Sequence, residues 1–331
     1  MSIYEHPPTS PNLQRALKAT LPYSINLVCR TKHPNRTQHA HVLATFSTEE
    51  ASIPECWVAA YFDDSMRPET DLWIFAAAEV PDHAGSSPDG KFCPKCKQLV
   101  LTLLDYLSRL EIAPLRSENQ YIWDIDRPKN SAHLDYYGHL LVPHVVTLGA
   151  VHHQVVEICE DIGIVRDDFP GRGAKLNKFF FNTSDLPLER ELPPGLRWGD
   201  MRAEDNPIVL ASTSIPRVES TLLSLKSLGI FNEETDKPVS WAFLGLDGSL
   251  TTLTTDPKYR GKGLAKALVT KLLRNHASKL AVDDKGNAWA HADVYEGNKQ
   301  SESVCRSLGG NAGAKIFWVR IDLKGARQKT T

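Results

Sequence analysis

The chain has 331 residues, of which 41% are hydrophobic and 24% charged, and its formal net charge at pH 7 is −2. This length and apolar content predict two modest domains or one large one with a packed core, and the near-neutral charge argues against a nucleic-acid-binding surface. No apolar run reaches membrane-spanning length and the first residues lack a secretory apolar region, so we expect a cytoplasmic protein that spans no membrane and keeps its six cysteines reduced.

The first half of the chain reads as an alternation of helices and strands. The apolar spacing predicts a helix around residues 13–21, strands over 23–30, 41–46, 56–62 and 71–80, a helix from residue 96 to 110, a strand over 121–125, a helix over 151–162 and a strand over 176–182.

The second half repeats this order. We predict a strand over residues 197–202, helices over 203–212 and 218–228, strands over 238–246 and 249–255 joined by a hairpin turn at Asp247-Gly248, a helix from residue 264, a strand over 288–295, a helix over 299–308 and a strand over 314–323. The repeated order indicates an α+β protein of two related domains, with residues 1–190 in the first and 191–331 in the second.

A glycine-containing turn precedes the long helix of the second half. Residues 260–265 read R-G-K-G-L-A, directly after a strand that Asp256-Pro257 ends. Gly261 and Gly263 let the backbone approach a ligand closely, and the free N–H groups and dipole of a helix N-terminus favour an anion there. The turn therefore predicts a site for a phosphorylated ligand, although a tight connection between strand and helix would use the same residues.

The longer pattern P-x-Y-R-G-x-G-L-A at residues 257–265 resembles the acyl-CoA pyrophosphate loop of the GNAT superfamily of N-acyltransferases. Residues 293–309 resemble the segment with which that family closes the other side of its acyl-CoA cleft. Asn298 and Ser301 match its CoA-contacting positions, and Asn298 also suits a helix N-cap. The resemblance covers residues 197–323, and the tandem organisation is most similar to the glycine N-acyltransferase-like branch.

This resemblance implies two tandem GNAT-like domains, each a mixed, mostly antiparallel twisted sheet flanked by helices. The first is degenerate, because it has K-F-C-P-K-C where the second has the glycine turn. The implied co-substrate is acetyl-CoA or another acyl-CoA, with a backbone N–H at Thr254 polarising the thioester carbonyl. The implied binding residues are Leu253, Thr254, Thr255, Arg260, Gly261, Lys262, Gly263, Leu264, Ala265, Asn298 and Ser301.

The catalytic positions depart from the family pattern. Many relatives have a tyrosine acid seven residues after the asparagine, where this chain has Cys305, which could protonate the leaving thiolate or be a small buried residue. We favour Asp293 over His291 as the base that deprotonates the amine, with a structural hydrogen bond as the alternative role for Asp293. Tyr295 and Trp241 are expected to shape the acceptor pocket or to pack.

We predict that the protein holds no metal. Cys93-x-x-Cys96 has the spacing of half a zinc site, but no second such pair follows, and the histidines downstream lie beyond the gap that a zinc finger uses. These are His133, His139 and His144.

The predicted reaction is transfer of an acyl group to a small-molecule amine by direct attack in a ternary complex. The alternatives are an O-acyltransferase and an acyl-CoA-binding module without catalysis. The sequence leaves the amine, the acyl-chain length and the oligomeric state open.

Overall fold

A computed structural model of the chain describes residues 2–86, 90–115, 142, 144–167, 174–213 and 217–327. These residues form two compact units. Unit 1 comprises residues 1–27, 36–176 and 314–331, and unit 2 comprises residues 28–35 and 177–313. The predicted boundary at residue 190 therefore differs from the division into units, and two segments belong to the unit made mostly by the other half.

Unit 1 is built on a sheet with the strand order β1-β2-β3-β4-β5-β13. Every neighbouring pair is antiparallel except β4 and β5, which run parallel. The strands are β1 (Tyr4–Glu5), β2 (His41–Ala44), β3 (Val58–Phe62), β4 (Leu72–Ala76), β5 (Val145–His152) and β13 (Asn311–Asp322), and the helices are α1 (Pro11–Ala19), α3 (Pro94–Leu107), α6 (His153–Asp161) and α11 (Leu323–Ala326).

The core of unit 1 forms between its sheet and α3 and α6. Apolar residues of α3 recur at helical spacing and are buried together with residues of β3, β4 and β5. Leu103 and Leu104 are fully buried, and each such side chain contributes about 1.5–3 kcal/mol to stability. Helix α3 begins at Pro94, where the missing N–H of proline suits the first turn, and the side chain of Cys93 caps it.

Unit 2 has the same plan, with the strand order β6-β12-β10-β9-β8-β7. Its β10 and β12 run parallel, like β4 and β5 of unit 1, while β7 to β10 form an antiparallel meander. The strands are β6 (Leu176–Asn182), β7 (Leu196–Gly199), β8 (Lys226–Asn232), β9 (Pro238–Leu244), β10 (Ser249–Thr255), β11 (Ala281–Val282) and β12 (Ala288–Tyr295), and the helices are α7 (Asn206–Ala211), α8 (Glu219–Ser224), α9 (Leu264–Leu272) and α10 (Lys299–Ser307).

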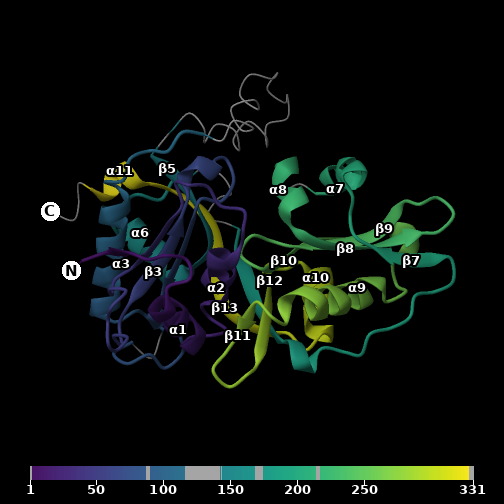
Figure 1. The fold of residues 1–331 in the computed structure, drawn as a ribbon, viewed down its shortest axis with the longest axis horizontal. Helices are drawn as coiled ribbons and strands as arrows, with labels where there is room; N and C mark the ends of the chain where they lie inside the picture. Colours follow the sequence, from purple (N-terminus) through teal and green to yellow (C-terminus); the bar gives the residue numbers. More distant parts are fainter. Residues whose placement is uncertain are drawn as a thin grey trace. The chain divides into compact units, whose positions relative to one another are not determined.

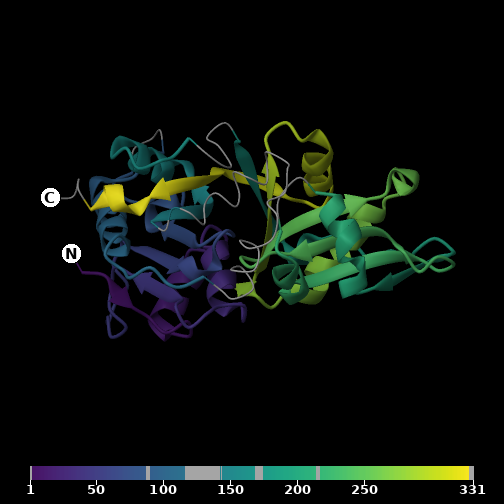
Figure 2. The same cartoon turned by 90° about the horizontal axis from the view of Figure 1, so that it is seen from above.

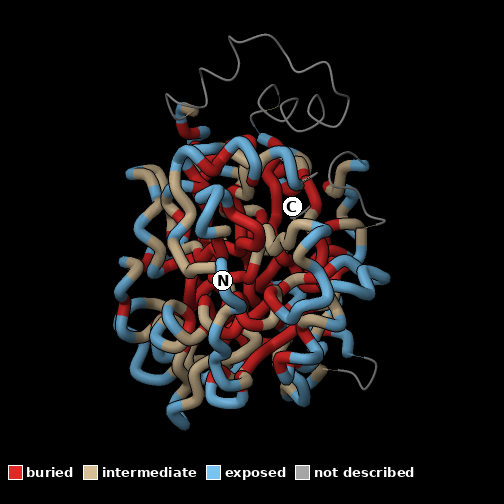
Figure 3. The backbone as a smooth tube through the Cα atoms, turned by 90° about the vertical axis from the view of Figure 1, so that its right-hand side faces the viewer, coloured by how far each residue is buried: buried red, intermediate tan, exposed pale blue. Residues whose placement is uncertain are grey.

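Helix α9 packs on the meander of unit 2 and carries most of its helical core residues. Leu268, Val269 and Leu272 are fully buried against strands β8 to β10, whereas α7 and α8 lie on the other side of β8 (Figure 1). Figure 2 shows the strands of each unit in a second view. Figure 3 shows that the buried segments gather in the interior. Both units therefore confirm the predicted fold class, a mixed and mostly antiparallel sheet flanked by helices.

The last strand of each half belongs to the other unit. From Asn177 onward, β6 lies in unit 2, although it ends the N-terminal half. From Ala314 onward, β13 lies in unit 1, where it pairs with β5 over residues 316–322. The element order alone could not indicate this exchange, because a strand that stayed in its own half would have the same sequence pattern.

Three predicted elements differ from the structure. Residues 23–30 were expected to form a strand, but Ile25–Lys32 is helix α2, and its burial on most sides hides the helical period. The helix predicted over residues 218–228 ends at Ser224, and β8 begins two residues later. The helix predicted over 151–162 is preceded by the unpredicted strand β5. The strand predicted over 121–125, and His133 and His139, lie outside the described residues.

Candidate functional site

The glycine turn joins β10 to α9 and presents the start of that helix. A short 3-10 turn follows Asp256, whose side chain accepts a hydrogen bond from the N–H of Lys258. Gly261 and Gly263 have φ values of 76° and 77°, in the left-handed region that other residues rarely adopt. Residues 260–263 are exposed, whereas Leu264 is buried and anchors the first turn of α9. The turn thus holds exposed N–H groups at a helix N-terminus, which suits an anion.

Basic side chains surround this turn. The Nε of Arg260 donates to the carbonyl oxygen of Thr255 at 3.0 Å, and the Nζ of Lys262 lies 5.2 Å from the centre of the Tyr259 ring. A Cβ atom added to Gly263 would lie 3.6 Å from Nη1 of Arg190. The sequence did not indicate Arg190, because it lies in the polar stretch between the halves and matches no motif.

Strand β10 is irregular next to the turn and parts from β12. Its antiparallel register with β9 shifts between Thr251 and Thr254, and Thr252 has a φ of 56°, as in a β-bulge. Its parallel register with β12 covers Ser249 and Leu250 and stops there in the described part of the chain. The rest of β10 therefore has backbone groups that are not part of the ladder with β12.

Hydrogen bonds show which way the backbone of β10 faces. The Oγ of Ser240 on β9 donates to the carbonyl oxygen of Thr254 at 2.9 Å, so the backbone of Thr254 faces β9. The carbonyl of Thr255 instead accepts from Arg260, which agrees with the alternation of neighbouring residues in a strand. On the other side of the bulge, Nη2 of Arg217 donates to Oγ1 of Thr251 at 2.7 Å and supports the start of the bulge.

Asp293 lies in a buried ion pair on the sheet of unit 2. Its Oδ1 accepts from Nζ of Lys178 on β6 at 2.8 Å, and the two side chains are only 4% and 5% exposed. The Nε2 of His291 lies 3.0 Å from the carbonyl oxygen of Asp247 and must donate to it, which leaves Nδ1 to accept from Lys178 at 3.3 Å. Both ring nitrogens of His291 thus have buried partners.

The surroundings of Asp293 make it a weak base. Burial raises the pKa of its carboxyl, but the positive charge of Lys178 and the hydrogen bond that Lys178 donates outweigh burial and hold the pKa at about 2. A carboxylate with so low a pKa takes up a proton poorly near neutral pH. The prediction that Asp293 is the general base stays a prediction, and its ion pair matches the structural role that the sequence left open.

Cys305 lies on α10 and is buried, with 3% of its surface exposed. Burial, together with the negative charges of Asp293 and Glu302, raises the pKa of its thiol to about 12. Such a thiol stays protonated but gives up its proton less readily than an ordinary thiol, with a pKa of about 8.5. These properties favour the alternative of a small buried residue.

The remaining predicted residues lie at the ends of β12 and α10 and on β9. The side chain of Asn298 accepts from the N–H of Ser301 at 3.1 Å and caps α10, so the expected N-cap role is confirmed. Tyr295 is 41% exposed at the end of β12, and burial of part of its ring raises the pKa of its hydroxyl. Trp241 is buried, and its indole nitrogen has no hydrogen-bond partner among the described residues.

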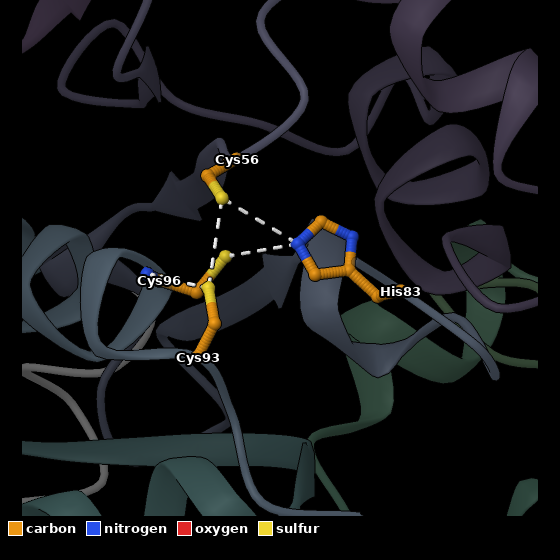
Figure 4. A group of neighbouring side chains, drawn as sticks. All are labelled: Cys56, His83, Cys93 and Cys96. Carbon is orange, nitrogen blue, oxygen red and sulfur yellow. Dashed lines mark hydrogen bonds between the residues drawn. The ribbon is translucent and has the colours of Figure 1, made fainter. Parts of the chain in front are cut away.

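The cysteine pair that the sequence set aside has further neighbours in unit 1. The sulfur atoms of Cys93 and Cys96 lie with the sulfur of Cys56 and a ring nitrogen of His83, all within 4.8 Å of one another (Figure 4). Cys56 and His83 precede the pair in the chain, and no sequence motif links them to it. The residues present therefore fit a metal ion at a place where none was predicted.

Comparisons with known proteins agree with the fold. Residues 1–179 match the family model described as the N-terminal domain of the acyl-CoA N-acyltransferase verG, and residues 227–319 match the FR47-like protein family. No curated protein matches the chain. The FR47-like match includes the turn at residues 260–265 and the strand and helix on either side of it.

Solved structures match almost the whole chain. A Drosophila protein of 14% identity has a TM-score of 0.58 and aligns with 97% of this chain and 99% of its own, which supports the fold. A tandem GNAT protein from the clavulanic acid biosynthesis pathway is 10% identical over 97% of this chain and 98% of its own, with a TM-score of 0.45. A GCN5-related N-acetyltransferase from Sphaerobacter thermophilus is 11% identical over 97% and 95%, with a TM-score of 0.46.

No helix in the described ranges is long and apolar enough to cross a membrane. The verG-type domain model covers more than half of the chain, and an FR47-like domain follows it. The protein therefore belongs to the acyl-CoA N-acyltransferases of the GNAT superfamily, with two GNAT-like domains in tandem.

Proposed function

We propose that unit 2 binds acyl-CoA, with acetyl-CoA as the leading candidate, and transfers the acyl group to a small-molecule amine. One arrangement carries this proposal: two left-handed glycines at the N-terminus of α9, directly after a bulged strand that parts from its parallel neighbour. The first feature suits a pyrophosphate, and the second leaves backbone donors and acceptors for an extended polar chain. Pyrophosphate and extended pantetheine arm are the two parts of CoA that lie closest to its thioester.

In this proposal the pyrophosphate binds the N–H groups of residues 261–265, with Arg260, Lys262 and Arg190 supplying positive charge. The pantetheine arm then follows β10 from Thr255 toward the bulge. The backbone of Thr254 faces β9, so we assign the N–H that polarises the thioester carbonyl to Leu253, two residues before Thr255. Asn298 and Ser301 would form the opposite wall.

The chemistry would be direct attack of a neutral amine on the thioester carbon. The new C–N bond forms as the C–S bond breaks, the amine loses a proton and CoA leaves as a thiolate that takes up a proton. The low pKa of Asp293 and the high pKa of Cys305 weaken both as proton carriers. We therefore assign the removal of the amine proton to a water molecule. Tyr295, at the end of β12, is our candidate for the acid that protonates the leaving thiolate.

The test is release of free CoA thiol from acetyl-CoA and longer acyl-CoAs in the presence of a panel of amines and alcohols. Gly263→Trp places a bulky side chain on the turn and should abolish release. Gly286→Trp is the matched control, because Gly286 has the same left-handed backbone, with a φ of 84° and open space around its Cβ position, but lies in the turn between β11 and β12.

The outcomes distinguish three hypotheses: an N-acyltransferase, an O-acyltransferase and an acyl-CoA-binding module without catalysis. Amine-dependent release that Gly263→Trp alone abolishes supports the N-acyltransferase and identifies the acceptor class. Release with alcohols but not amines would support an O-acyltransferase. Tight acyl-CoA binding without release on any acceptor would contradict catalysis and support a binding module.

A further inference from the structure

Three cysteines and one histidine from separate parts of unit 1 point at a common centre (Figure 4). Cys56 lies just before β3, His83 in the loop that follows β4, and Cys93 and Cys96 at the beginning of α3. The cluster has no part in the acyl-CoA site proposed above, which lies in unit 2. It adjoins the core of unit 1, of which its three cysteines are members.

The spacing of the ligand atoms is that of a tetrahedral zinc site. Zinc bonds of about 2.3 Å to sulfur and about 2.0 Å to nitrogen place two sulfurs about 3.8 Å apart, and a sulfur and a nitrogen about 3.5 Å apart. The Sγ atoms of Cys56 and Cys93 are 3.6 Å apart, and Nε2 of His83 lies 3.5 Å from the sulfurs of both Cys56 and Cys96. All four atoms lie within 4.8 Å of one another, so one ion can reach each of them.

The ligand set indicates which metal and which role. Three thiolates and an imidazole favour zinc over calcium or magnesium, which prefer oxygen ligands. The three cysteines are buried and His83 is half-buried. Because the protein supplies all four ligands, no position stays open for water or substrate, which is the pattern of a structural site.

The surroundings stabilise negative charge at this place. The N–H of Cys96 donates to the sulfur of Cys93 at 3.3 Å, and Cys93 is the N-cap of α3. Zinc with three thiolates carries a net charge of −1, which the N-terminus of a helix favours. Gly85, with a φ of 76°, lets the loop of His83 pass close to Cys93, since a Cβ on Gly85 would lie 3.3 Å from the Cβ of Cys93.

We propose that Cys56, His83, Cys93 and Cys96 bind one structural zinc ion. The ion would tie the loop after β4 to the segment just before β3 and to the first turn of α3. Residues 80–86 are mostly exposed, so little core packing holds this loop. Coordination of zinc by His83 would hold the loop in its place. The competing interpretation of the same atoms is a disulfide, because Cys56 and Cys93 are neighbours and both are free cysteines here.

The test begins with the full chain purified under reducing conditions without chelator. Elemental analysis by mass spectrometry should find about one zinc ion per chain. X-ray absorption spectroscopy at the zinc edge should find three sulfur ligands and one nitrogen ligand. Cobalt added to the metal-free protein should give the visible absorption of a tetrahedral thiolate site. These measurements use the unmodified protein, so they do not depend on a variant that folds.

Variants then locate the ion. Cys56→Ser, Cys96→Ser and His83→Asn should each lose bound zinc and lower the melting temperature. Cys159→Ala is the matched control, since Cys159 is an equally buried free cysteine of unit 1 outside the cluster and should keep about one zinc. The proposal would be overturned if the metal-free protein bound no cobalt under reducing conditions. A Cys56–Cys93 disulfide in protein purified under reducing conditions would overturn it as well.

Discussion

Removal of one partner of the buried Lys178–Asp293 pair should destabilise the protein strongly. Their charged atoms are 2.8 Å apart and almost without contact to solvent. At an effective dielectric constant of about 20, two unit charges at this distance attract each other by roughly 6 kcal/mol, which offsets the loss of hydration of both. Asp293→Asn leaves Lys178 buried without its counter-charge, so we expect the free energy of unfolding to fall by about 3–5 kcal/mol.

The assay is urea unfolding followed by tryptophan fluorescence for four proteins: the wild type, Asp293→Asn, Lys178→Met and a double variant Lys178→Met/Asp293→Leu. Each single substitution should lower the unfolding midpoint without a change in the slope, because the surface exposed on unfolding stays the same. The double variant should recover most of the loss, since apolar groups often replace a buried ion pair without a net penalty.

The same pair predicts that the free energy of unfolding falls at acidic pH. The pKa of Asp293 is about 2 in the folded protein, against an ordinary value of 3.8, so the folded state favours the ionised carboxyl. This contribution is fully present above pH 3.8 and is lost as the pH falls toward 2, and it amounts to roughly 2 kcal/mol. In Asp293→Asn this part of the pH dependence should be missing.

The catalytic readout decides between the two roles of Asp293. A structural role predicts that the double variant regains CoA release together with stability. If Asp293→Asn kept full stability while CoA release fell by a factor of a thousand or more, the reasoning would be refuted and Asp293 would be the base.

Three other substitutions and one control substitution test the site. Gly261→Ala and Gly286→Ala impose a similar left-handed strain of about 1–2 kcal/mol in open space, but Gly261→Ala alone should weaken acyl-CoA binding roughly tenfold to a hundredfold, as measured by calorimetry. Cys305→Ala should keep kcat within about twofold in steady-state kinetics, because a thiol with a pKa of about 12 is a poor acid, and a large loss would contradict this. Arg217→Met removes the hydrogen bond to Thr251 and should raise the KM for acyl-CoA, while an unchanged KM would show that the bulge does not need it.

The sequence predicted best where short-range chemistry determines the structure. The strand, glycine turn and helix around Gly261 follow from local signals, and the structure has all three. Helix α2 was misread because it is buried on most sides, so its apolar residues show no clear period. The start of β8 was missed because the apolar residues of α8 and β8 run on with no breaker between them.

The site depended more on tertiary contacts. Nothing near Asp293 in the sequence indicates Lys178, because the two lie on different strands far apart in the chain. The zinc ligands proposed here show the same difficulty, since Cys56 lies just before a strand and His83 in a loop, and neither has a fixed spacing to the pair at Cys93 and Cys96. The folded sheet of unit 1 and helix α3 bring the four proposed zinc ligands together.

The exchanged final strands have a consequence for synthesis on the ribosome. Strand β5 is buried throughout, and one of its two partners is β13, which is made more than 150 residues later. At about 5–20 residues per second, the edge of β5 waits roughly 8–30 seconds for that partner. A newly made chain must therefore shield the apolar, unpaired edge of β5 during this interval. Substitutions that delay the pairing of β13 with β5 should cause aggregation in the cell before they lower the stability of the folded protein.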